Sequence, residues 1–385
     1  MKLNIMIVAG EASGDLHASS LVREMKKINP DLHFSGIGGD KMKNEGVELF
    51  YHVNEMSVLG FGDVIKSFPF FRRVFKYIVA SMKKMKPDLL ILIDYPGLNF
   101  KFAKEAQKLS IPVFYYIAPQ VWAWGSGRIK KMTKIIDKMG VILPFEEDLF
   151  SSAGIQAHFV GHPLLDSFTT KMTKSEFFTK NNIKNEDKII GLLPGSRTHE
   201  VNRLLPVMLD TAKELNLKFN NLKFIVARTS TISDQTYDEI AHDLPNVQFI
   251  YGQTYEIMNY SDFLIVKSGT STLESALAKT PFIIVYKVDP FSYFIGRILV
   301  KIKFIGLVNV IAGKRIVPEF IQHECVTEKL VPTIETLLCN NDERHKMISE
   351  FEKLRHMLGE KGAAGRAAKL ALETINRTEL DEEKD

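Results

Sequence analysis

Two turns in the second half of the chain combine glycine, hydroxyl and basic residues in the pattern of an anion-binding site. The first is Gly195-Ser196-Arg197, which follows an apolar run, and the second is the helix start Ser268-Gly269-Thr270-Ser271. Free N–H groups and the dipole at a helix start favour a phosphate, and the planar guanidinium of Arg197 suits one better than a lysine would. Glu274, about one helical turn later, could accept hydrogen bonds from a ribose diol. The pattern predicts a diphosphate site; an ordinary turn and plain helix capping are the alternatives.

Carboxylates follow apolar runs in the first half of the chain. Asp94 ends the run DLLILID just before a Pro-Gly break, which makes it the candidate general base; the alternative is that it caps the following helix. The fallback bases surround the first predicted turn and are Glu11, Asp15 and His17. Candidate sugar contacts come from that turn, from the residues after Asp94 and from the stretch YYIAPQVWAW, and they are Ser13, Asn99, Gln120 and Trp122. We therefore expect acid–base chemistry in this half.

The stretch 56–86 mixes basic residues with large apolar ones. Its candidate lipid or membrane contacts are Val58, Leu59, Phe61, Ile65, Phe68, Phe70, Phe71, Arg72 and Arg73. Such a mixture is typical of a membrane-surface element or an acyl-chain site. A core helix with a solvated basic edge is the alternative, and we favour it for residues 74–79.

Several other chemistries are disfavoured. The chain lacks GxxxxGK[ST], its turn GEASGD does not match GxGxxG, and it has no DxD pair, so we expect no cofactor and no metal. The net charge of +4 comes without a long Lys/Arg tract, which argues against nucleic acid. Cys325 and Cys339 have no metal-ligand spacing and fit a reducing cytoplasm. No apolar run reaches the roughly 18 residues of a membrane-spanning helix.

Apolar runs alternate with helical patterns along the chain, which predicts an α/β fold with two doubly wound parallel sheets. In the first half the expected strands are Leu3–Ala9, His33–Ile37, Asp88–Asp94, Val113–Ile117, Lys138–Leu143 and His158–Val160. In the second half they are Ile189–Leu193, Lys223–Ala227, Val247–Tyr251, Phe263–Val266 and Phe282–Tyr286. We expect Rossmann-like domains at residues 1–168 and 169–350, then C-terminal helices and a charged tail at 351–385. Ligands bind beyond the carboxyl ends of such strands, so the candidate residues would line a cleft that the two domains face.

A series of longer motifs resembles one enzyme family. Over about residues 8–278 the chain carries, in order, GEASGDLHAS, SVLGFGDV, IDYPGLN, APQVWAWGSGRIKKM, LPFE, VGHPL, LLPGSRTHEV and KSGTSTLESAL, and GLVNVIAGKRIVPEFIQ follows at 306–322. Together these motifs resemble bacterial lipid-A-disaccharide synthase, a GT-B glycosyltransferase. The chain departs from the usual family pattern at Leu98, Gln120, Gly125 and Val308, where Phe, Ser, a basic residue and Pro are more usual. Those departures concern substrate contacts rather than the fold.

The resemblance implies a reaction and a role for each candidate. UDP-2,3-diacylglucosamine would donate its sugar to the 6-hydroxyl of 2,3-diacylglucosamine 1-phosphate, with inversion, giving a β-1,6-linked disaccharide 1-phosphate and UDP. The two glycine turns would hold the diphosphate, and Arg197 would stabilise charge on the leaving UDP. Glu274 would hold the ribose, Asn309 is carried over as a nucleotide contact, and Asp94 would take the proton of the acceptor hydroxyl.

The resemblance also implies a metal-independent enzyme, peripheral on the cytoplasmic face of the inner membrane. C-terminal helices that cross back to the first domain are expected in a GT-B fold, and a homodimer stays open. One alternative is another GT-B enzyme that uses a UDP-sugar, such as a peptidoglycan-precursor transferase or a non-hydrolysing epimerase. Another is a non-catalytic nucleotide-binding protein that docks on membranes.

Overall fold

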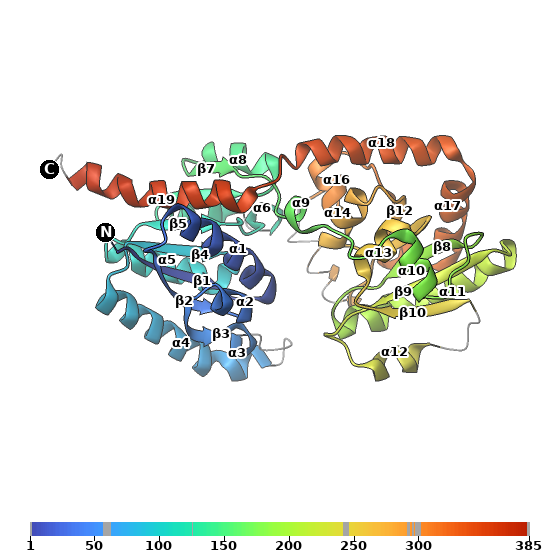
Figure 1. Cartoon of the computed structure of the whole chain (residues 1–385), viewed down its shortest axis with the longest axis horizontal. Coiled ribbons are helices and arrows are strands. Elements are labelled where there is room, and N and C mark those ends of the chain that lie inside the picture. Colours follow the sequence, from blue (N-terminus) through green and yellow to red (C-terminus); the bar gives the residue numbers. More distant parts are fainter. Residues whose placement is uncertain are drawn as a thin grey trace. The chain divides into compact units, whose positions relative to one another are not determined.

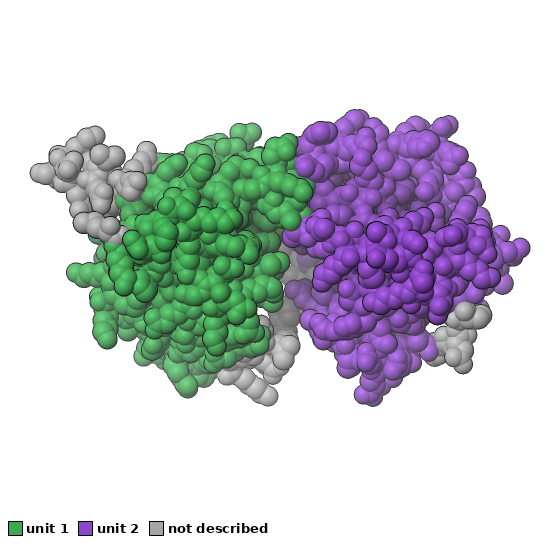
Figure 2. All heavy atoms as spheres, in the orientation of Figure 1, with its two compact units in different colours: residues 1–166, 358–385 green, residues 167–357 purple. Residues whose placement is uncertain are grey.

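The computed structural model of the chain consists of two compact units (Figure 2). It describes residues 2–56, 63–124, 126–241, 246–290, 293–294, 296 and 302–382. Unit 1 comprises Met1–Asp166 together with Leu358–Asp385, and unit 2 comprises Ser167–Met357. The chain therefore leaves unit 1 and returns to it at its C-terminal end.

Unit 1 is built on a seven-stranded sheet in the order β3-β2-β1-β4-β5-β6-β7, and every strand pair between neighbours is parallel. The strands are β1 (Asn4–Ala9), β2 (His33–Gly38), β3 (Glu48–His52), β4 (Leu89–Ile93), β5 (Val113–Tyr116), β6 (Lys138–Val141) and β7 (Gln156–Phe159). The central strands are continuous apolar runs because helices cover both of their faces. Edge strand β3 was not expected from the sequence, because its half-exposed ELFYH residues do not form such a run.

Two apolar cores lie on opposite faces of this sheet, since successive strand residues point to opposite sides. One core is covered by α4 (Asp63–Met85), α5 (Pro96–Lys108), α7 (Ile129–Met132) and α8 (Pro144–Ser151). The other is covered by α1 (Ala12–Ile28) and by α19 (Ala363–Glu382), which lies beside α1 (Figure 1). Ala367, Ala368 and Ala371 let α19 approach closely. The expected return of the C-terminal helix to the first half is confirmed.

The remaining short helices of unit 1 follow the strands. They are α2 (Asp40–Asn44), α3 (Val53–Met56), α6 (Val121–Trp124), η1 (Ser126–Arg128) and, where the chain passes to unit 2, α9 (Leu164–Ser167). Among them α2 and α6 follow the carboxyl ends of β2 and β5, so they border the edge of the sheet where the candidate residues lie.

Unit 2 contains a six-stranded parallel sheet in the order β10-β9-β8-β11-β12-β13. Its strands are β8 (Lys188–Leu193), β9 (Leu222–Arg228), β10 (Val247–Tyr251), β11 (Phe263–Lys267), β12 (Phe282–Tyr286) and β13 (Glu319–Ile321). Its helices are α10 (Lys174–Lys180), α11 (Thr198–Lys218), α12 (Asp234–Ile240), α13 (Thr254–Tyr260), α14 (Thr270–Leu277), α16 (Leu307–Ala312), η2 (Gln322–Glu324), α17 (Thr327–Cys339) and α18 (Asn341–Met357). The expected α/β fold with two parallel sheets is confirmed.

Each sheet has a topological switch point, where successive strands are added on opposite sides of the first one. In unit 1 the switch point lies between β1 and β4, and in unit 2 it lies between β8 and β11. Ligands of doubly wound sheets bind beyond the carboxyl ends of the strands at such a point. Asp94 and Glu11 follow β4 and β1, whereas the Arg197 turn and Ser268 follow β8 and β11. The topology thus brings the candidates of each half together within their own unit.

Candidate functional site

The turn after β8 is shaped by a glycine and a buried carboxylate. Gly195 has φ of 120°, and a Cβ atom there would clash with the side chain of Glu200. Oε2 of Glu200 accepts a hydrogen bond of 3.1 Å from the backbone N–H of Ser196. Only glycine fits this combination of positive φ and close approach, so the Pro-Gly break in the sequence has a structural cause.

Glu200 holds the two cations of the unit 2 switch point. Its Oε1 lies 2.7 Å from Nζ of Lys267 at the end of β11 and 3.6 Å from Nη1 of Arg197. Burial raises the pKa of Glu200, but the hydrogen bond and charge of Lys267, with smaller help from Ser196 and Arg197, outweigh burial and lower it. The Arg197 side chain keeps 67% of its surface exposed. Glu200 and Lys267 were not among the expected site residues, and their pairing links two turns that are far apart in sequence.

The turn after β11 opens α14 with Gly269 as its N-cap, at φ of 152° and without a side-chain cap. The hydroxyl of Ser268 donates to the carbonyl of Ile305 at 2.8 Å, and that of Thr272 donates to the carbonyl of Gly269 at 2.8 Å. Thr270 at the start of the helix is exposed. The first N–H groups of α14 have no acceptors within the helix, so they can bind an anion. Plain side-chain capping by an N-cap hydroxyl does not account for this cluster.

Glu274 lies on α14 within reach of two hydroxyl groups. The phenol of Tyr255 on α13 donates to its Oε1 at 3.0 Å, and the ring of Tyr255 packs on Phe168 with centroids 4.7 Å apart. Burial raises the pKa of Glu274, while hydrogen bonds from Tyr255 and Ser271 oppose the shift. The carboxylate is therefore oriented before any ligand is bound, and Tyr255 is a residue that no sequence pattern singled out.

Asn309 is fully buried, and its amide is used inside unit 2. The amide nitrogen donates to the carbonyl of Val317 and to Oε1 of Glu319, both at 2.8 Å. The amide oxygen accepts from the N–H groups of Ile316 at 2.8 Å and Val317 at 3.0 Å. This side chain therefore fastens the segment before β13 to α16, and its role as a nucleotide contact stays a prediction.

Asp94 in unit 1 has φ of 45°, in the left-handed region that few non-glycine residues adopt. Burial raises its pKa to about 6, and the negative charge of Glu11 adds to the shift, whereas the N–H of Tyr95 opposes it. The N-cap of α5 is Tyr95 rather than Asp94. The helix-cap alternative is thus disfavoured, and the carboxyl is available for proton transfer near neutral pH.

Hydrogen bonds from two buried side chains stabilise the backbone conformation of Asp94. Nδ2 of Asn99 donates to the carbonyl of Asp94 at 2.7 Å and to that of Ile93 at 3.1 Å. The phenol of Tyr115 also donates to the carbonyl of Asp94. Asn99 has no exposed surface and holds the loop that carries Asp94, so its contact with the acceptor sugar stays a prediction that the structure does not support.

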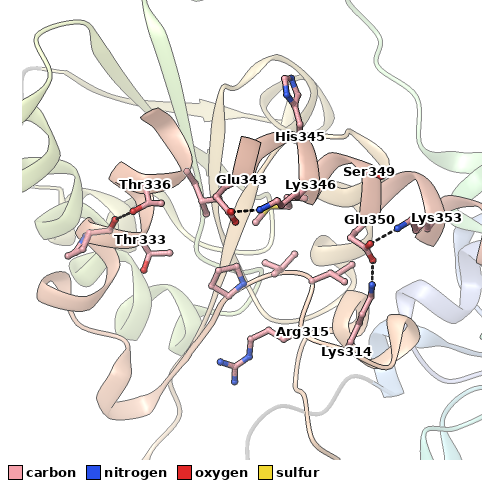
Figure 3. Close-up of a pocket in the computed structure, with 16 residues that line it drawn as sticks. Lys314, Arg315, Thr333, Thr336, Glu343, His345, Lys346, Ser349, Glu350 and Lys353 are labelled. Carbon is pink, nitrogen blue, oxygen red and sulfur yellow. Dashed lines mark hydrogen bonds and ion pairs between the residues drawn. The ribbon is translucent and has the colours of Figure 1, made fainter. Parts of the chain in front are cut away.

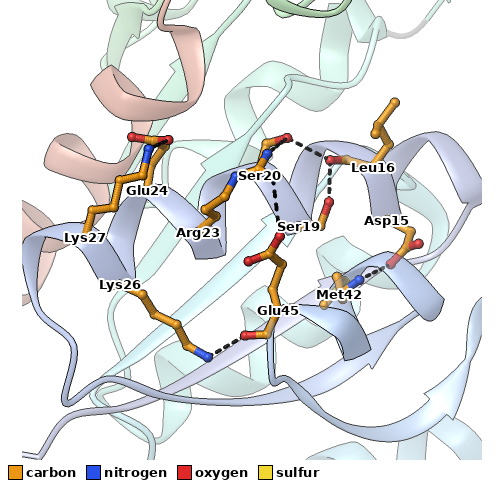
Figure 4. A network of polar contacts seen from close by, with 10 residues as sticks. All are labelled: Asp15, Leu16, Ser19, Ser20, Arg23, Glu24, Lys26, Lys27, Met42 and Glu45. Carbon is orange, nitrogen blue, oxygen red and sulfur yellow. Dashed lines mark hydrogen bonds and ion pairs between the residues drawn. The ribbon is translucent and has the colours of Figure 1, made fainter.

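The fallback bases lie near the first turn but differ in availability. Asp15 is buried and caps α2, where its carboxylate accepts from the N–H groups of Gly39 at 2.7 Å and Met42 at 3.0 Å (Figure 4). Burial lowers the pKa of His17 to about 4, so it is a neutral and weak base. Glu11 is exposed beside Asp94, and Ser13 is exposed too. Asp15 is therefore a structural residue, and Glu11 remains the better fallback.

The tryptophan loop is anchored by a second buried acid. The indole N–H of Trp122 donates to Oε1 of Glu146 at 3.0 Å, and its ring meets Phe145 edge-on with centroids 5.0 Å apart. Burial raises the pKa of Glu146 to about 7. Gln120 is exposed at the start of this loop. The indole nitrogen is thus already bonded, so a sugar could meet Trp122 through its ring but not through that donor.

Known proteins place the chain in a family. A family model described as lipid-A-disaccharide synthetase matches residues 5–374. The chain belongs to this family. A lipid-A-disaccharide synthase of Syntrophus aciditrophicus (strain SB) is 44% identical over 97% of this chain and 98% of its own length. A lipid-A-disaccharide synthase of Geobacter metallireducens (strain ATCC 53774 / DSM 7210 / GS-15) is 38% identical over 97% of each chain. The resemblance read from the motifs is confirmed, and the chain is a glycosyltransferase.

Solved structures of more distantly related proteins share the fold of this chain. A UDP-GlcNAc 2-epimerase from Neisseria meningitidis bound to UDP-GlcNAc superposes with a TM-score of 0.64 at 14% identity, covering 97% of this chain and all of the other. CalG4, the calicheamicin glycosyltransferase, gives 0.61 at 12% identity, covering 98% and 99%. At such identities the likeness supports the fold, and GT-B is confirmed as its class.

A lipid-A-disaccharide synthetase needs surfaces for acyl chains, and α4 and α5 enclose an apolar hollow of about 450 Å³. Its walls are Phe68, Phe71, Phe75, Tyr95 and Leu98, with Arg72 and Lys101 also lining it. Phe68 is 65% exposed, Phe70 and Phe71 are half-buried, and Arg72 and Arg73 are exposed. Val58, Leu59 and Phe61 and the side chain of Ile65 lie outside the described residues.

The structure also bears on whether the chain could bind a metal ion or cross a membrane. Across the ranges that it describes, no three His, Cys, Asp or Glu residues gather in a way that could hold a metal ion. In the same ranges, none of the helices is both long and apolar enough to pass through a membrane.

Proposed function

We propose that this chain transfers 2,3-diacylglucosamine from UDP-2,3-diacylglucosamine to the 6-hydroxyl of 2,3-diacylglucosamine 1-phosphate. The products are the β-1,6-linked disaccharide 1-phosphate and UDP, with inversion at the anomeric carbon. The observation that carries the proposal is the contrast between the two switch points. One unit presents a carboxyl with a raised pKa and the other presents cations and a helix start.

Unit 2 is proposed to bind the UDP portion of the donor. The turn Gly195-Ser196-Arg197 and the start of α14 at Ser268-Gly269-Thr270-Ser271 supply N–H groups and positive charge for the diphosphate. Glu274, oriented by Tyr255, accepts hydrogen bonds from the ribose. As the bond from the anomeric carbon to UDP breaks, its electron pair stays on the leaving phosphate, and the guanidinium of Arg197 stabilises that charge.

Unit 1 is proposed to activate the acceptor. With a pKa of about 6, Asp94 is mostly ionised at neutral pH and can accept the proton of the 6-hydroxyl as the oxygen attacks the anomeric carbon. Attack from the side opposite the leaving group gives inversion. Glu11 is the fallback base, and the ring of Trp122 and the exposed Ser13 and Gln120 are the acceptor-side contacts.

Both substrates are acylated, so we place the enzyme on the cytoplasmic face of the inner membrane as a peripheral protein. The hollow between α4 and α5 is the proposed path for an acyl chain, because its apolar walls reach from the exposed Phe68 to Tyr95, which follows Asp94 in sequence. Arg72, which lines the hollow, and the exposed Arg73 next to it in sequence favour anionic lipid.

The proposal is tested by UDP release from detergent-dispersed donor and acceptor, with a metal chelator present. Undiminished turnover in chelator is expected, since Arg197 and the helix start take the charge-stabilising role. Absence of turnover with the diacylated pair, or its loss in chelator, would count against the proposal. Conversion of non-acylated UDP-N-acetylglucosamine would favour an epimerase or another GT-B enzyme instead.

A further inference from the structure

A second hollow of unit 1 is lined by cations over an apolar floor. Its volume is about 1150 Å³, and it is bounded by α5, by η1 and α7, and by the turn before β6. Its cationic lining residues are Lys104, Lys108, Arg128, Lys130, Lys131 and Lys134. Its floor is formed by Phe100, Met132, Ile135 and Ala153. Among the described residues that line it, none is Asp or Glu.

The part of the chain that supplies most of this hollow carries far more positive than negative charge. Residues 66–134 carry 14 Lys and Arg against three Asp and Glu, although the whole chain has a net charge of only +4. Two of those three acids are already bonded, because Glu105 pairs with Lys108 at 2.7 Å and Asp88 accepts from the N–H of Asn4. The third is Asp94 at the switch point. Throughout the described ranges, Lys104, Lys130, Lys131 and Lys134 have no carboxylate within ion-pair distance.

A basic hollow of unit 2 shows the opposite arrangement (Figure 3). Its volume is about 950 Å³, and it is bounded by α17, α18 and the segment before β13. There Lys314 and Lys353 each bond to Glu350 at 2.6 Å, and Lys346 bonds to Glu343 at 2.7 Å. All three lysines that line it are thus paired with a carboxylate within the fold. The lysines around α7 therefore differ from an ordinary charged surface in lacking internal counter-charges.

We propose that the hollow between α5 and α7 binds the phosphate head group of an anionic membrane phospholipid, with the first acyl carbons on its apolar floor. Like charges that line one hollow repel one another, and a phosphate would relieve that repulsion. A free phosphate would make no contact with Phe100, Met132 and Ile135. A nucleic acid would gain little from this floor, because Phe100 is the one aromatic ring among the described lining residues on which a base could stack. The lysine stems can pack along the apolar surface while their ammonium groups reach the head group.

This inference goes beyond the acyl-chain hollow between α4 and α5 and rests on the proposed function only in placing the enzyme at a membrane. The full chain is mixed with vesicles of phosphatidylcholine alone or of phosphatidylcholine with phosphatidylglycerol, and sedimentation is measured without sugar substrates. Binding is expected to the anionic vesicles. The double variant K130Q/K131Q should bind them roughly thirtyfold more weakly, given the usual gain per lysine near an anionic surface.

Matched variants separate a head-group site from general surface charge. K41Q/K43Q removes the same charge from exposed lysines of α2, and it should keep most of the binding. K130R/K131R keeps the charge and should also bind. Unchanged thermal unfolding of K130Q/K131Q shows that the variant is folded.

Four outcomes would overturn the inference. They are equal losses in K130Q/K131Q and K41Q/K43Q, equal binding to neutral and anionic vesicles, complete displacement by inorganic phosphate at the ionic strength of a chloride control, and tighter binding of a short RNA that K130Q/K131Q abolishes. Because the vesicles hold no donor or acceptor, the result stands apart from success or failure of the transferase assay.

Discussion

The switch points of the two units have the same strand topology but differ in charge. In unit 1 the turns after β1 and β4 carry Glu11 and Asp94, and the second of these is partly buried with a pKa of about 6. In unit 2 the turn after β8 carries Arg197 and the end of β11 carries Lys267, and Glu200 holds both. Because the topology is shared, the difference in function must come from the side chains grafted on it. One unit is suited to remove a proton and the other to hold a departing anion.

A substitution of Asp94 tests the difference between the two units most directly. Asp94→Asn removes the base, so kcat should fall by about 10²–10⁴-fold while UDP affinity stays unchanged. Initial rates of UDP release and calorimetric titration with UDP measure the two quantities. If Asp94→Asn keeps its activity, Glu11 becomes the better candidate for the base. If Asp94→Asn loses UDP affinity, UDP binding and acceptor activation are not separate functions of the two units.

Asp94→Asn should lower kcat but raise the stability of the folded chain at neutral pH. The pKa of Asp94 rises from 3.8 to about 6 on folding, so the unfolded chain loses its proton first as pH increases. The free energy of unfolding should therefore decline between about pH 4 and pH 6, by at most about 3 kcal/mol from this group. Asp94→Asn should be flatter over that range and more stable at pH 7. Denaturant unfolding at several pH values measures this, and identical pH profiles would refute it.

On the cationic side, Arg197→Lys keeps the charge and loses the planar fork. If the guanidinium stabilises charge that develops during reaction, kcat should fall by about a hundredfold while UDP binds nearly as before. Steady-state kinetics and UDP titration of the same preparation test this. Equal losses in rate and affinity would make the turn a binding site only.

Each unit contains a buried asparagine, and substituting the two separately tests whether positioning of Asp94 matters for the reaction. Asn99 supports the Asp94 loop in unit 1, whereas Asn309 fastens the segment before β13 in unit 2. Asn99→Ala should reduce kcat about tenfold by misplacing the base, without weakening UDP binding. Asn309→Ala is the matched control, expected to destabilise unit 2 and to leave the acid limb of the pH–rate profile in place. Equal kinetic effects of both variants would argue against a positioning role for Asn99.

The smallest expected effect is electrostatic. The negative charge of Glu11 raises the pKa of Asp94, so Glu11→Gln should lower it. If the ionised form of Asp94 is the base, as proposed, the acid limb of kcat/KM near pH 6 should move to lower pH by a fraction of a unit. A limb that stays in place in Glu11→Gln but disappears in Asp94→Asn would mean that the two carboxyls are not coupled.

The sequence predicted which residues lie at strand ends better than it predicted what their side chains contact. Turns at strand ends have strong local signals, so the amino-acid pattern alone places Asp94, Gly195-Ser196-Arg197 and the start of α14 at such ends. Asn99 and Asn309 were assigned to ligands because an amide can donate outward or inward, and only the fold shows that both point inward. Strand β3 escaped notice because an edge strand need not be apolar throughout.

The missed residues depend on contacts between distant parts of the chain. Glu200 lies on a helix pattern like any exposed acid, and its role appears only when β8 and β11 pair and bring Lys267 beside it. Tyr255 likewise meets Glu274 through the packing of α13 on α14. Periodicity and turn chemistry carry no information about such pairs, whereas they suffice for the order of strands and helices.

The most direct test of this division of labour is mass spectrometry of the products from UDP-2,3-diacylglucosamine and 2,3-diacylglucosamine 1-phosphate, with wild-type enzyme and with Asp94→Asn. The wild type should form the disaccharide 1-phosphate and one UDP per disaccharide, and Asp94→Asn should bind UDP but form almost no disaccharide. A product other than the disaccharide, or full disaccharide formation by Asp94→Asn, would contradict the account.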